Sequence, residues 1–440
     1  MALLLPHPRR PRVSRAAAAA AGKKWGRRVI SRERYVGKLW VSERVGGVEL
    51  FMYGLAQHRL YFHGGAETAC VITTHAAGHQ YCMFRKTLVA LSVAALLRDA
   101  QGGAWPFACR ANATIADVAT FLDLPDHVVV VTGADGRSGQ QISMAAAMAN
   151  ATVILQGRNE THLAAAAASI REVVPTARLD VAVFDLSDLN ATAKGAAALK
   201  NKYPKIDVLV NNAGGIDSDL SHDGYVNTWQ VNAIAPALIT AALTPALERA
   251  PAPRCVYVAS ASNFDGATPG AWPAATKRTA ADMLNYAQQR PAVGMVADYG
   301  MSKLVLVHYV KELSKRAKEA AEMARASVRS ASVISHISVN PGFFRVPPFT
   351  PDQKAQCAQA LHFSPCPQTP AQGAASTAFA ALTPGAHAAT GQMLDFKTDI
   401  GADGWMQSGE TCVPRPLPAW VQAESEAWYE AVQRIVGQYL

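Results

Sequence analysis

The chain has 440 residues, half of them apolar and 17% charged. Such a composition supports at least one large buried core, and it excludes fibrous and wholly disordered proteins. The formal net charge of +9 comes from residues 1–40, which carry eleven Lys or Arg and a single acid, Glu33. A basic tail on a nearly neutral body predicts targeting or a flexible arm, so we expect no nucleic-acid partner.

The seven cysteines are scattered and form no C-x-x-C pair, which predicts free thiols rather than a disulfide framework. Cys70, His75, His79 and Cys82 have the side chains that bind zinc, but their spacing matches none of the usual zinc-finger patterns. We therefore predict no metal site and interpret this stretch as loosely ordered.

Residues 1–125 are a predicted N-terminal extension with features of targeting. The Arg- and Ala-rich start resembles an organellar transit peptide. Further on, a basic stretch after Met83 precedes the apolar run Leu88–Leu97, which resembles a secretory signal or a short anchor. That run is about ten residues long, fewer than the ~20 that span a bilayer. We expect an organelle or the endoplasmic reticulum rather than plain cytosol. Membrane association through the extension stays open. Whether translation starts at Met1 or at Met83 also stays open.

From His127 onward, strand-like and helix-like segments alternate. The predicted strands are the run "HVVVVTG" that begins at His127, Thr152–Leu155, Val181–Phe184, Val208–Val210, Cys255–Val258 and Ile337–Val339. The predicted helices are Gly139–Ala149, Glu160–Val173, Leu189–Asn201, Tyr225–Leu247 and Tyr299–Ala324. Apolar strands that alternate with helices predict an α/β fold with a doubly wound parallel sheet, whose ligand site lies at the carboxyl ends of the strands.

Two further segments complete the predicted organisation. Residues 264–297 contain three prolines around a helical piece and are interpreted as an insertion near the site. The end of the chain, Leu417–Leu440, has apolar residues at helical spacing, which predicts a helix packed on the body. The domain is thus predicted over residues 126–405, followed by a linker and helix over 406–440.

A glycine-rich loop follows the first predicted strand. It contains Thr132, Gly133, Gly136, Arg137, Ser138 and Gly139. Glycines allow the backbone to approach a pyrophosphate, at which the next helix points its positive N-terminus. At the end of the next strand stands Arg158, where an acid would favour NAD and an arginine suits the 2′-phosphate of NADP. The sequence therefore favours NADP over NAD.

Tyr299 and Lys303 are four residues apart, on one face of a predicted helix. A nearby ammonium favours the phenolate, so we expect Lys303 to lower the pKa of Tyr299 toward the working pH. Tyr299 could then exchange a proton with a substrate oxygen while hydride moves to or from a nicotinamide. Ser260 precedes this pair at the end of a strand, and "NNAG", Asn211 to Gly214, follows an earlier strand.

From about Pro125 to Asp399 the chain resembles the classical short-chain dehydrogenases/reductases, which have a Rossmann fold. "DVLVNNAG", "DGYVNTWQVNAIAPALIT", "YGMSKLVLVHYVKELSKR", "VNPGFFR" and "TPAQGA" with "TGQML" occur in the family's order. The closer resemblance is to the branch of retinol dehydrogenases and WW-domain oxidoreductases. Their members often pair through two long helices, which here begin near Tyr225 and Tyr299, so a homodimer stays open.

The resemblance implies a catalytic tetrad of Asn232, Ser260, Tyr299 and Lys303. In it, Ser260 hydrogen-bonds the substrate oxygen and Tyr299 is the acid/base. Lys303 holds the nicotinamide ribose, and Asn232 positions a water in the proton relay. The resemblance also implies cofactor contacts from Asp185 to the adenine, from Asn211, Ala213 and Gly214 along the cofactor, and from Pro341 and Gly342 beside the nicotinamide.

Two residues depart from the family pattern: Arg137 stands in place of a glycine and Val346 in place of a threonine. Our interpretation is an NADP-dependent carbonyl reductase or alcohol dehydrogenase acting on an apolar small molecule. The alternative is a catalytically impaired NADP-binding scaffold or redox sensor of the same fold.

Overall fold

The computed structural model divides the chain into two units, Met1–Gly103 and Ala104–Leu440. It describes residues 113–120, 122–260, 287–288, 295–326, 333–342, 350–351, 369–384, 386, 390–395, 398–400, 406–408, 413–415 and 419–440, together with the strands β1 to β6 of the first unit. Val346 and most of the predicted insertion 264–297 lie outside these residues.

The first unit contains a six-stranded antiparallel sheet in which the strands pair in chain order. Its strands are β1 Arg34–Val36, β2 Leu39–Val41, β3 Phe51–Leu55, β4 His58–Gly65, β5 Thr68–Thr74 and β6 Gln80–Phe84. The sequence predicted none of these strands, and the interpretation of residues 70–82 as loosely ordered was wrong for β5 and β6. Cys70 and Cys82 lie on these two strands, whose side chains are outside the described part of the chain, so the prediction of no metal site there stays untested.

The second unit is built on an eight-stranded sheet in the order β16-β13-β12-β11-β10-β7-β8-β9. Seven strands are parallel and β16, Val413–Arg415, is antiparallel to β13. The others are β7 Val128–Thr132, β8 Thr152–Gly157, β9 Arg178–Val183, β10 Val208–Asn211, β11 Arg254–Val258, β12 Ser335–Val339 and β13 Met393–Asp395. The short pair β14 Thr398–Ile400 and β15 Met406–Ser408 forms a separate antiparallel ribbon. The predicted doubly wound α/β fold is confirmed.

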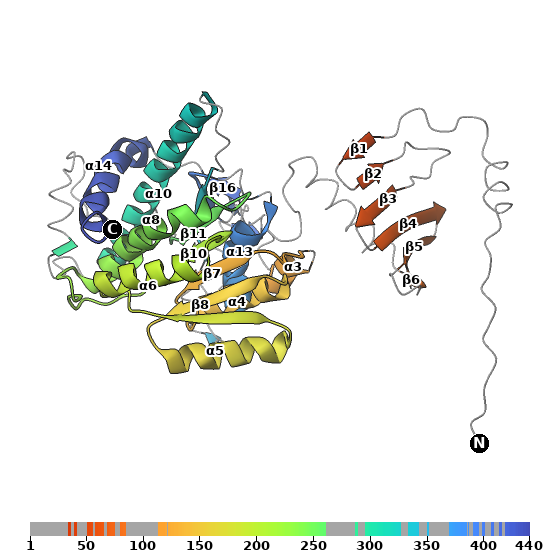
Figure 1. The fold of residues 1–440 in the computed structure, drawn as a ribbon, viewed down its shortest axis with the longest axis horizontal. Coiled ribbons are helices and arrows are strands. Elements are labelled where there is room, and N and C mark those ends of the chain that lie inside the picture. Colours follow the sequence, from red (N-terminus) through yellow and green to blue (C-terminus); the bar gives the residue numbers. More distant parts are fainter. Residues whose placement is uncertain are drawn as a thin grey trace, which may run out of the picture. The chain divides into compact units, whose positions relative to one another are not determined.

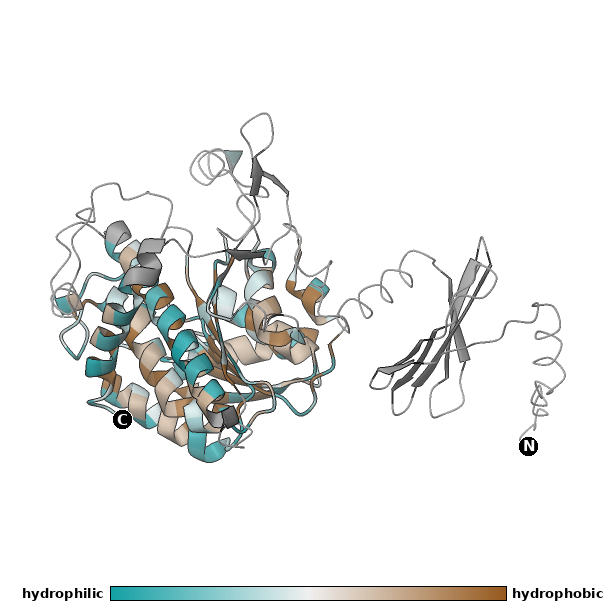
Figure 2. Cartoon of the chain, turned by 90° about the horizontal axis from the view of Figure 1, so that it is seen from above, coloured by the Kyte–Doolittle hydropathy of each residue, from teal (hydrophilic) through white to brown (hydrophobic). Residues whose placement is uncertain are grey.

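Helices cover both faces of this sheet (Figure 1). One face carries α3 Ile115–Ala119, α4 Arg137–Met148, α5 Glu160–Val173, α12 Pro370–Gly373 and α13 Ala375–Leu382. The other face carries α6 Leu189–Lys202, α8 Ala235–Leu247, α10 Met295–Ala326 and α14 Ala419–Val436. Hydrophobic residues concentrate between the layers, and hydrophilic residues lie on the outer faces of the helices (Figure 2).

The central strands owe their position to β-branched, apolar residues on both faces. Val129, Val130 and Val131 of β7 are fully buried, as expected for a parallel strand covered by two helical layers. The edge strand β9 is different, because Val181 and Val183 are exposed there. The carboxyl ends of β7 and β10 meet at the reversal of strand order, which is where such sheets bind ligands.

The predicted helix Tyr225–Leu247 is less regular than expected. It begins with α7, Asn227–Trp229, and continues through a π-helical turn, η1 Gln230–Ile234, into α8. The stretch Asn227–Leu247 is the one helix of the described residues that is long and apolar enough to cross a membrane, and 72% of its apolar window is buried in the body. A buried core helix accounts for this composition.

The last helix, α14, packs along α10 and against α8. Trp428 is fully buried in this contact. Its ring stacks on Trp229, with 6.2 Å between ring centroids, and on His308, with 5.8 Å. The predicted packing of the C-terminal helix on the body is therefore present, with an aromatic anchor at its middle.

Candidate active site

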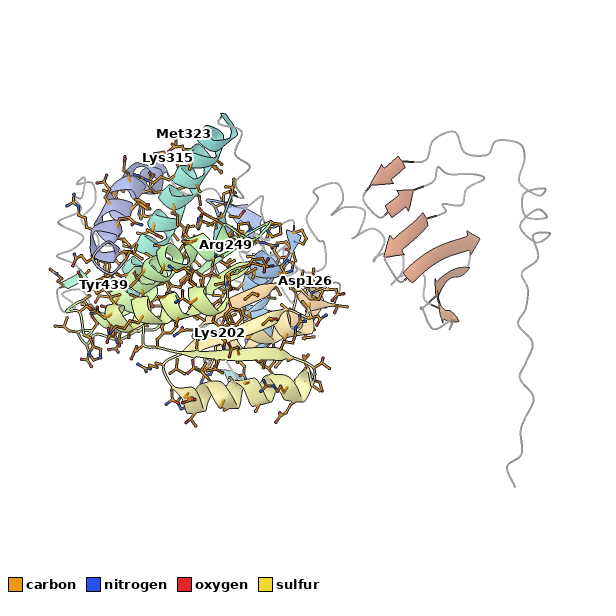
Figure 3. The ribbon with its side chains drawn as sticks, in the orientation of Figure 1. Asp126, Lys202, Arg249, Lys315, Met323 and Tyr439 are labelled. Carbon is orange, nitrogen blue, oxygen red and sulfur yellow. The ribbon has the colours of Figure 1, made fainter. Side chains whose placement is uncertain are left out.

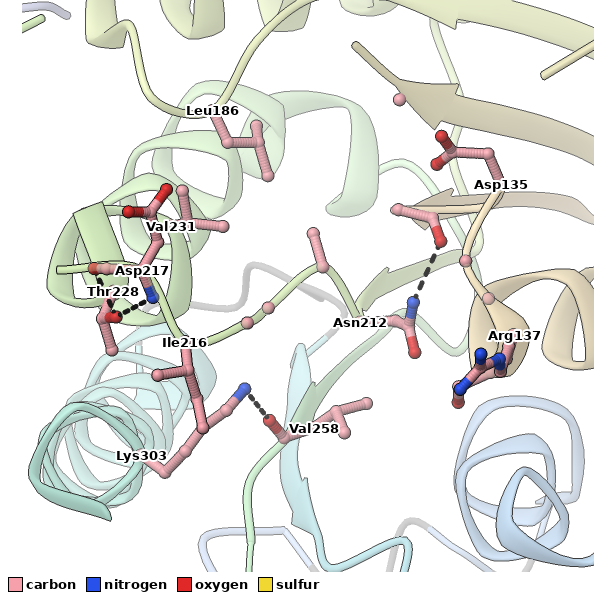
Figure 4. Close-up of a pocket in the computed structure, with 18 of the residues that line it drawn as sticks. Asp135, Arg137, Leu186, Asn212, Ile216, Asp217, Thr228, Val231, Val258 and Lys303 are labelled. Carbon is pink, nitrogen blue, oxygen red and sulfur yellow. Dashed lines mark hydrogen bonds between the residues drawn. The ribbon is translucent and has the colours of Figure 1, made fainter. Parts of the chain in front are cut away.

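A cavity of about 790 Å³ lies at the carboxyl ends of the central strands (Figure 4). Loops after β7, β8, β9, β10 and β11 form its walls, together with α10 and the turn after β12. Of the residues that the sequence predicted, the cavity is lined by Gly133, Arg137, Ser138, Gly139, Arg158, Asp185, Ala213, Gly214, Ser260, Tyr299, Lys303, Pro341 and Gly342. Thr132, Asn211 and Asn232 lie behind its walls.

The glycine loop between β7 and α4 is tightly folded. Gly133 has φ +61°, a left-handed conformation that favours glycine. The Gly136 N–H donates to the Gly133 carbonyl oxygen at 3.0 Å. A Cβ at Gly139 would lie 2.1 Å from that same oxygen, so no side chain fits there. Gly133 and Gly139 are therefore required by the backbone of the loop itself.

Arg137 is the first residue of α4 and its side chain is exposed, on the other side of the cavity from Lys303 (Figure 4). The N-cap is Gly136. Beside it, Ser138 Oγ is buried without a hydrogen-bond partner among the described residues. A helix N-terminus, an orphaned hydroxyl and an arginine at one cavity wall fit an anionic group such as a pyrophosphate. The arginine that replaces a family glycine thus leaves the inner turn of the loop unobstructed.

Asn212, which the sequence did not single out, ties the glycine loop to the loop after β10. Its Nδ2 donates to the carbonyl oxygen of Thr132 at 2.9 Å. Thr132 Oγ1 in turn accepts the N–H groups of Asn212 and Ala213, each at 3.0 Å. Asn211 is buried and donates from Nδ2 to Thr240 Oγ1 at 3.2 Å. Thr132 and Asn211 therefore hold the cavity wall from behind rather than line it.

Arg158, Asp185 and Leu186 line one end of the cavity, after β8 and β9. Asp185 Oδ1 accepts the N–H of Ser187 at 2.9 Å, which fixes the turn that follows β9. Gln156 Nε2 donates to the Phe184 carbonyl oxygen at 2.7 Å and holds the two strand ends together. This end combines an exposed cation with a polar turn of fixed shape.

Asp217 is a carboxylate of the cavity wall that the sequence analysis missed. Hydrogen bonds from the Asp219 N–H at 3.0 Å and from Asn227 Nδ2 at 2.7 Å hold it in place. Together with the positive charge of Arg158, these bonds hold the pKa of Asp217 below its usual value. It was missed in the sequence because its role depends on the hydrogen bonds that the folded loop and the start of α7 donate to it.

Ser260 and Tyr299 form a hydrogen-bonded pair at the other end of the cavity. Burial raises the pKa of Tyr299, and the hydrogen bond with Ser260 opposes that shift. Ser260 is the residue that follows the strand β11 by two positions, and Tyr299 lies in the first turns of α10. The fold thus brings together two residues that are 39 positions apart in the sequence.

Lys303 is buried, and its Nζ donates to the Val258 carbonyl oxygen at 2.8 Å (Figure 4). Burial lowers its pKa to about 8. Nζ lies 5.8 Å from the centroid of the Tyr299 ring. The expectation that Lys303 lowers the pKa of Tyr299 is not met in this state: desolvation of the phenol is the dominant effect, and the ammonium is engaged with a backbone carbonyl instead.

Asn232 lies in the π-helical turn η1 and is fully buried. Its Oδ1 accepts the Gly215 N–H at 3.0 Å, and its Nδ2 donates to Ser302 Oγ at 2.9 Å. A Cβ on Gly214 would lie 2.9 Å from both Asn232 Oδ1 and Lys303 Nζ. Gly214 therefore lies between Asn232 and Lys303, and Asn232 holds the backbone beside it.

The described residues contain no group of three or more His, Cys, Asp or Glu that could hold a metal ion. What the cavity offers is a long trough with the glycine loop and Arg158 along it, and a Ser–Tyr pair with a buried lysine at one end. Pro341 and Gly342 border that end, where Gly342 has φ +76° and donates its N–H to Asn340 Oδ1 at 3.1 Å. These residues fit a nicotinamide dinucleotide, whose two ends need such different surroundings.

Comparison with known proteins agrees with this geometry. Residues 127–292 match the family model of short chain dehydrogenases. An uncharacterized oxidoreductase of Schizosaccharomyces pombe is 27% identical over 60% of this chain and 76% of its own length. Retinol dehydrogenase 13 of Homo sapiens is 28% identical over 51% of this chain and 60% of its own. The WW domain-containing oxidoreductase of Gallus gallus is 30% identical, over 34% of this chain and 37% of its own.

Among solved structures, an uncharacterized protein from Mycobacterium paratuberculosis superposes with a TM-score of 0.52 at 20% identity, over 74% of this chain and 98% of its own. This likeness shows the fold. The relatives include the branch of retinol dehydrogenases and WW-domain oxidoreductases, as the sequence motifs predicted. In fold, motif order and relatives, the chain is similar to the short-chain dehydrogenase/reductase family of oxidoreductases, whose family model residues 127–292 match.

Proposed function

We propose that the chain is an NADP-dependent oxidoreductase that interconverts an alcohol and a carbonyl on an apolar small molecule. The observation that carries the proposal is the hydrogen-bonded Ser260–Tyr299 pair, which shares one cavity with the glycine loop and the N-terminus of α4. A proton-transfer group and an anion-binding wall in one cavity suit a reaction that couples a bound dinucleotide to a polar substrate oxygen.

Tyr299 is the proposed acid/base. Because burial raises its pKa, the hydroxyl is protonated at neutral pH and is ready to donate to a carbonyl oxygen as that oxygen gains charge. Ser260 supplies a second hydroxyl for the same oxygen. NADP(H), when bound, supplies or accepts the hydride. The ammonium of Lys303, with its pKa near 8, provides positive charge close to the developing phenolate.

The preference for NADP rests on Arg158, whereas Arg137 adds positive charge for the pyrophosphate that NADP and NAD share. Both side chains are exposed and both residues line the cavity, at positions that follow β8 and the glycine loop. A guanidinium forms bidentate hydrogen bonds with phosphate, so it would bind a 2′-phosphate more strongly than a ribose hydroxyl. An apolar substrate is supported by Ile216, which lines the cavity and is 50% exposed, and by the name of the relative retinol dehydrogenase 13.

A two-part experiment tests this function. First, titration of the full-length protein with NADPH and with NADH measures the two dissociation constants, and we expect NADPH to bind more tightly. Second, NADPH oxidation is followed with a panel of apolar aldehydes and ketones. We expect turnover that falls by about 10²–10⁴-fold in Tyr299→Phe, with NADPH affinity unchanged. NADPH binding without turnover by the wild-type protein on any carbonyl would instead support a cofactor-binding scaffold.

A further inference from the structure

The end of the chain is joined by a hydrogen bond to the loop between β10 and α7. After α14 the backbone turns, and the Tyr439 N–H donates to the Val436 carbonyl oxygen at 3.0 Å. This turn aims the Tyr439 hydroxyl at Asp223 Oδ1, to which it donates at 3.0 Å. Figure 3 shows Tyr439 at the C-terminal end of the molecule. We name residues 219–225, which carry Asp223, the Asp223 loop.

The other carboxylate oxygen of Asp223 joins two further elements. Asp223 Oδ2 accepts the N–H of Leu189, the first residue of α6, at 2.8 Å. The same oxygen accepts Gln230 Nε2, from the first residue of η1, also at 2.8 Å. One side chain therefore links the C-terminus, the start of α6 and the π-helical turn.

This network continues to the cavity wall. Gln230 Nε2 also donates to the carbonyl oxygen of Leu186 at 3.2 Å, and the His222 N–H donates to that of Ser187 at 3.1 Å. Gln230 is fully buried, so its bond to Leu186 is made without competition from water. Leu186 and its neighbour Asp185 line the end of the cavity that also holds Arg158. Only two side chains, Asp223 and Gln230, thus separate Tyr439 from the wall.

We infer that Tyr439 and Asp223 are positioning residues that hold the Asp185–Leu186 wall in the shape that receives the adenine end of the cofactor. Tyr439 acts through Asp223, and Asp223 acts through Gln230 and the backbone of α6. Since burial beside the Asp223 carboxylate raises the pKa of Tyr439 to about 12, its hydroxyl stays a donor throughout the physiological range. The inference rests on the proposed function in one respect, namely that this end of the cavity binds adenine.

The packing of α14 makes this inference testable with a mild substitution. Trp428, Val432 and Ile435 are buried against the body, so the helix stays docked when one hydroxyl is removed. Tyr439→Phe removes only the donor to Asp223. Tyr429→Phe is a matched control on the same helix, because the Tyr429 ring stacks on Tyr309 and Arg316 rather than contacting the Asp223 loop.

The experiment uses the full-length protein and two readouts. Hydrogen exchange of the Leu189 and His222 amides, without any ligand, reports whether Tyr439 fixes the Asp223 loop. Titration with adenosine 2′,5′-bisphosphate and with NADPH reports the affinity of the adenine end. For Tyr439→Phe we expect faster exchange at both amides, and dissociation constants of both probes raised by about three- to tenfold, as for the loss of about one hydrogen bond. At saturating NADPH, kcat stays at the wild-type value.

The possible outcomes separate the two ideas. Tyr439→Phe that behaves like Tyr429→Phe in exchange, or that changes exchange without weakening either probe, overturns the inference while the proposed function stands. A wild-type protein that binds neither probe overturns the proposed function and, with it, the assignment of this wall to adenine. Weakening of both probes by the same factor, with unchanged kcat, supports the inference, since a general loss of structure would also lower kcat.

Discussion

The two ends of the cavity are held in different ways. At the nucleotide end, side chains bind backbone groups: Asn212 ties the glycine loop down, and Asp223 and Gln230 fix the turn after β9. At the catalytic end, Lys303 is buried and Tyr299 is partly buried, and burial shifts both pKa values. Hydrogen bonds therefore fix the backbone at the nucleotide end, whereas desolvation shifts the pKa values of the side chains at the catalytic end.

This contrast explains which substitutions each end tolerates. A hydrogen-bonded backbone resists any added volume, whereas a desolvated acid or base is sensitive to the loss of a single charge or proton. Substitutions at both ends of the cavity and in the sheet test this contrast.

The largest effect is expected at the catalytic end, from Lys303→Met. We expect turnover to fall by about 10²–10⁴-fold, because the phenolate of Tyr299 loses its nearby positive charge. Stability should change little. The pKa of Lys303 is lowered to about 8 in the folded chain, so the charged form costs stability at neutral pH, and its removal offsets the lost hydrogen bond to Val258. Steady-state kinetics and thermal unfolding check both parts. If Lys303→Met is inactive because it is unfolded, Lys303 contributes to stability, and the contrast between the two ends of the cavity is wrong.

Gly139→Ala, at the nucleotide end, and Gly215→Ala, in the loop after β10, are a matched pair. A Cβ on Gly139 would lie 2.1 Å from the Gly133 carbonyl oxygen, whereas a Cβ on Gly215 meets nothing within 4 Å. We expect Gly139→Ala to lower the free energy of unfolding by about 3 kcal/mol, in the range of overpacked sites, and Gly215→Ala to leave it within about 0.5 kcal/mol. Urea denaturation measures both values. Equal stabilities would mean that the glycine loop is adaptable rather than fixed.

Beneath the catalytic end, His336 of β12 is buried and shares a hydrogen bond with the Tyr257 hydroxyl, 3.1 Å from Nδ1. Burial lowers its pKa to about 3. A histidine with a lowered pKa in the folded state contributes stability that is complete above pH ~6.5 and is lost as the pH falls from there toward 3. The loss is about 1.4 kcal/mol per pH unit, or about 2 kcal/mol between pH 6.5 and 5.

His336→Asn tests this dependence, since asparagine keeps a hydrogen-bonding group for Tyr257 but does not titrate. Unfolding free energies at pH 7.5 and pH 5 should show that the wild-type protein loses about 2 kcal/mol more than the variant. The same loss in both proteins would assign the acid sensitivity to other groups.

The smallest effect is expected from Arg158→Ala. Loss of one guanidinium contact to a 2′-phosphate should raise the dissociation constant of NADPH by about tenfold and leave that of NADH almost unchanged. Isothermal titration with both cofactors gives the ratio of the NADPH and NADH dissociation constants. Arg137→Ala, at the glycine loop, is the comparison, because its contact with the pyrophosphate is common to both cofactors and should weaken them equally. If Arg158→Ala and Arg137→Ala change the ratio of the two dissociation constants equally, Arg158 does not bind the 2′-phosphate.

The sequence predicted the parallel sheet well because its strands are runs of apolar, β-branched residues with an unambiguous pattern. Val129 to Val131 are an example. The strands β1 to β6 were not predicted, since short antiparallel strands depend on their neighbours more than on their own composition. The start of the predicted helix Tyr225–Leu247 was also displaced, because Val226 pairs with Leu220 in a β-bridge and the helix begins only at Asn227.

At the site, motif order was enough to bring Asn232, Ser260, Tyr299 and Lys303 together. It could not show that Lys303 binds the carbonyl of Val258 or that burial raises the pKa of Tyr299, because both depend on tertiary contacts. Asp217 and Asp223 were missed for the same reason. Each is an ordinary surface acid in the sequence, and only the folded chain shows what its oxygens accept.

The π-helical turn Gln230–Ile234 has a consequence for how the gene can change. Such a turn holds one residue more than an α-helical turn. Deletion of a single codon within it would restore a regular helix and rotate Asn232 by about 100° relative to the helix that follows. The Gly215 N–H and Ser302 Oγ would then lose their partner. The number of codons in this stretch is therefore constrained as well as their identity.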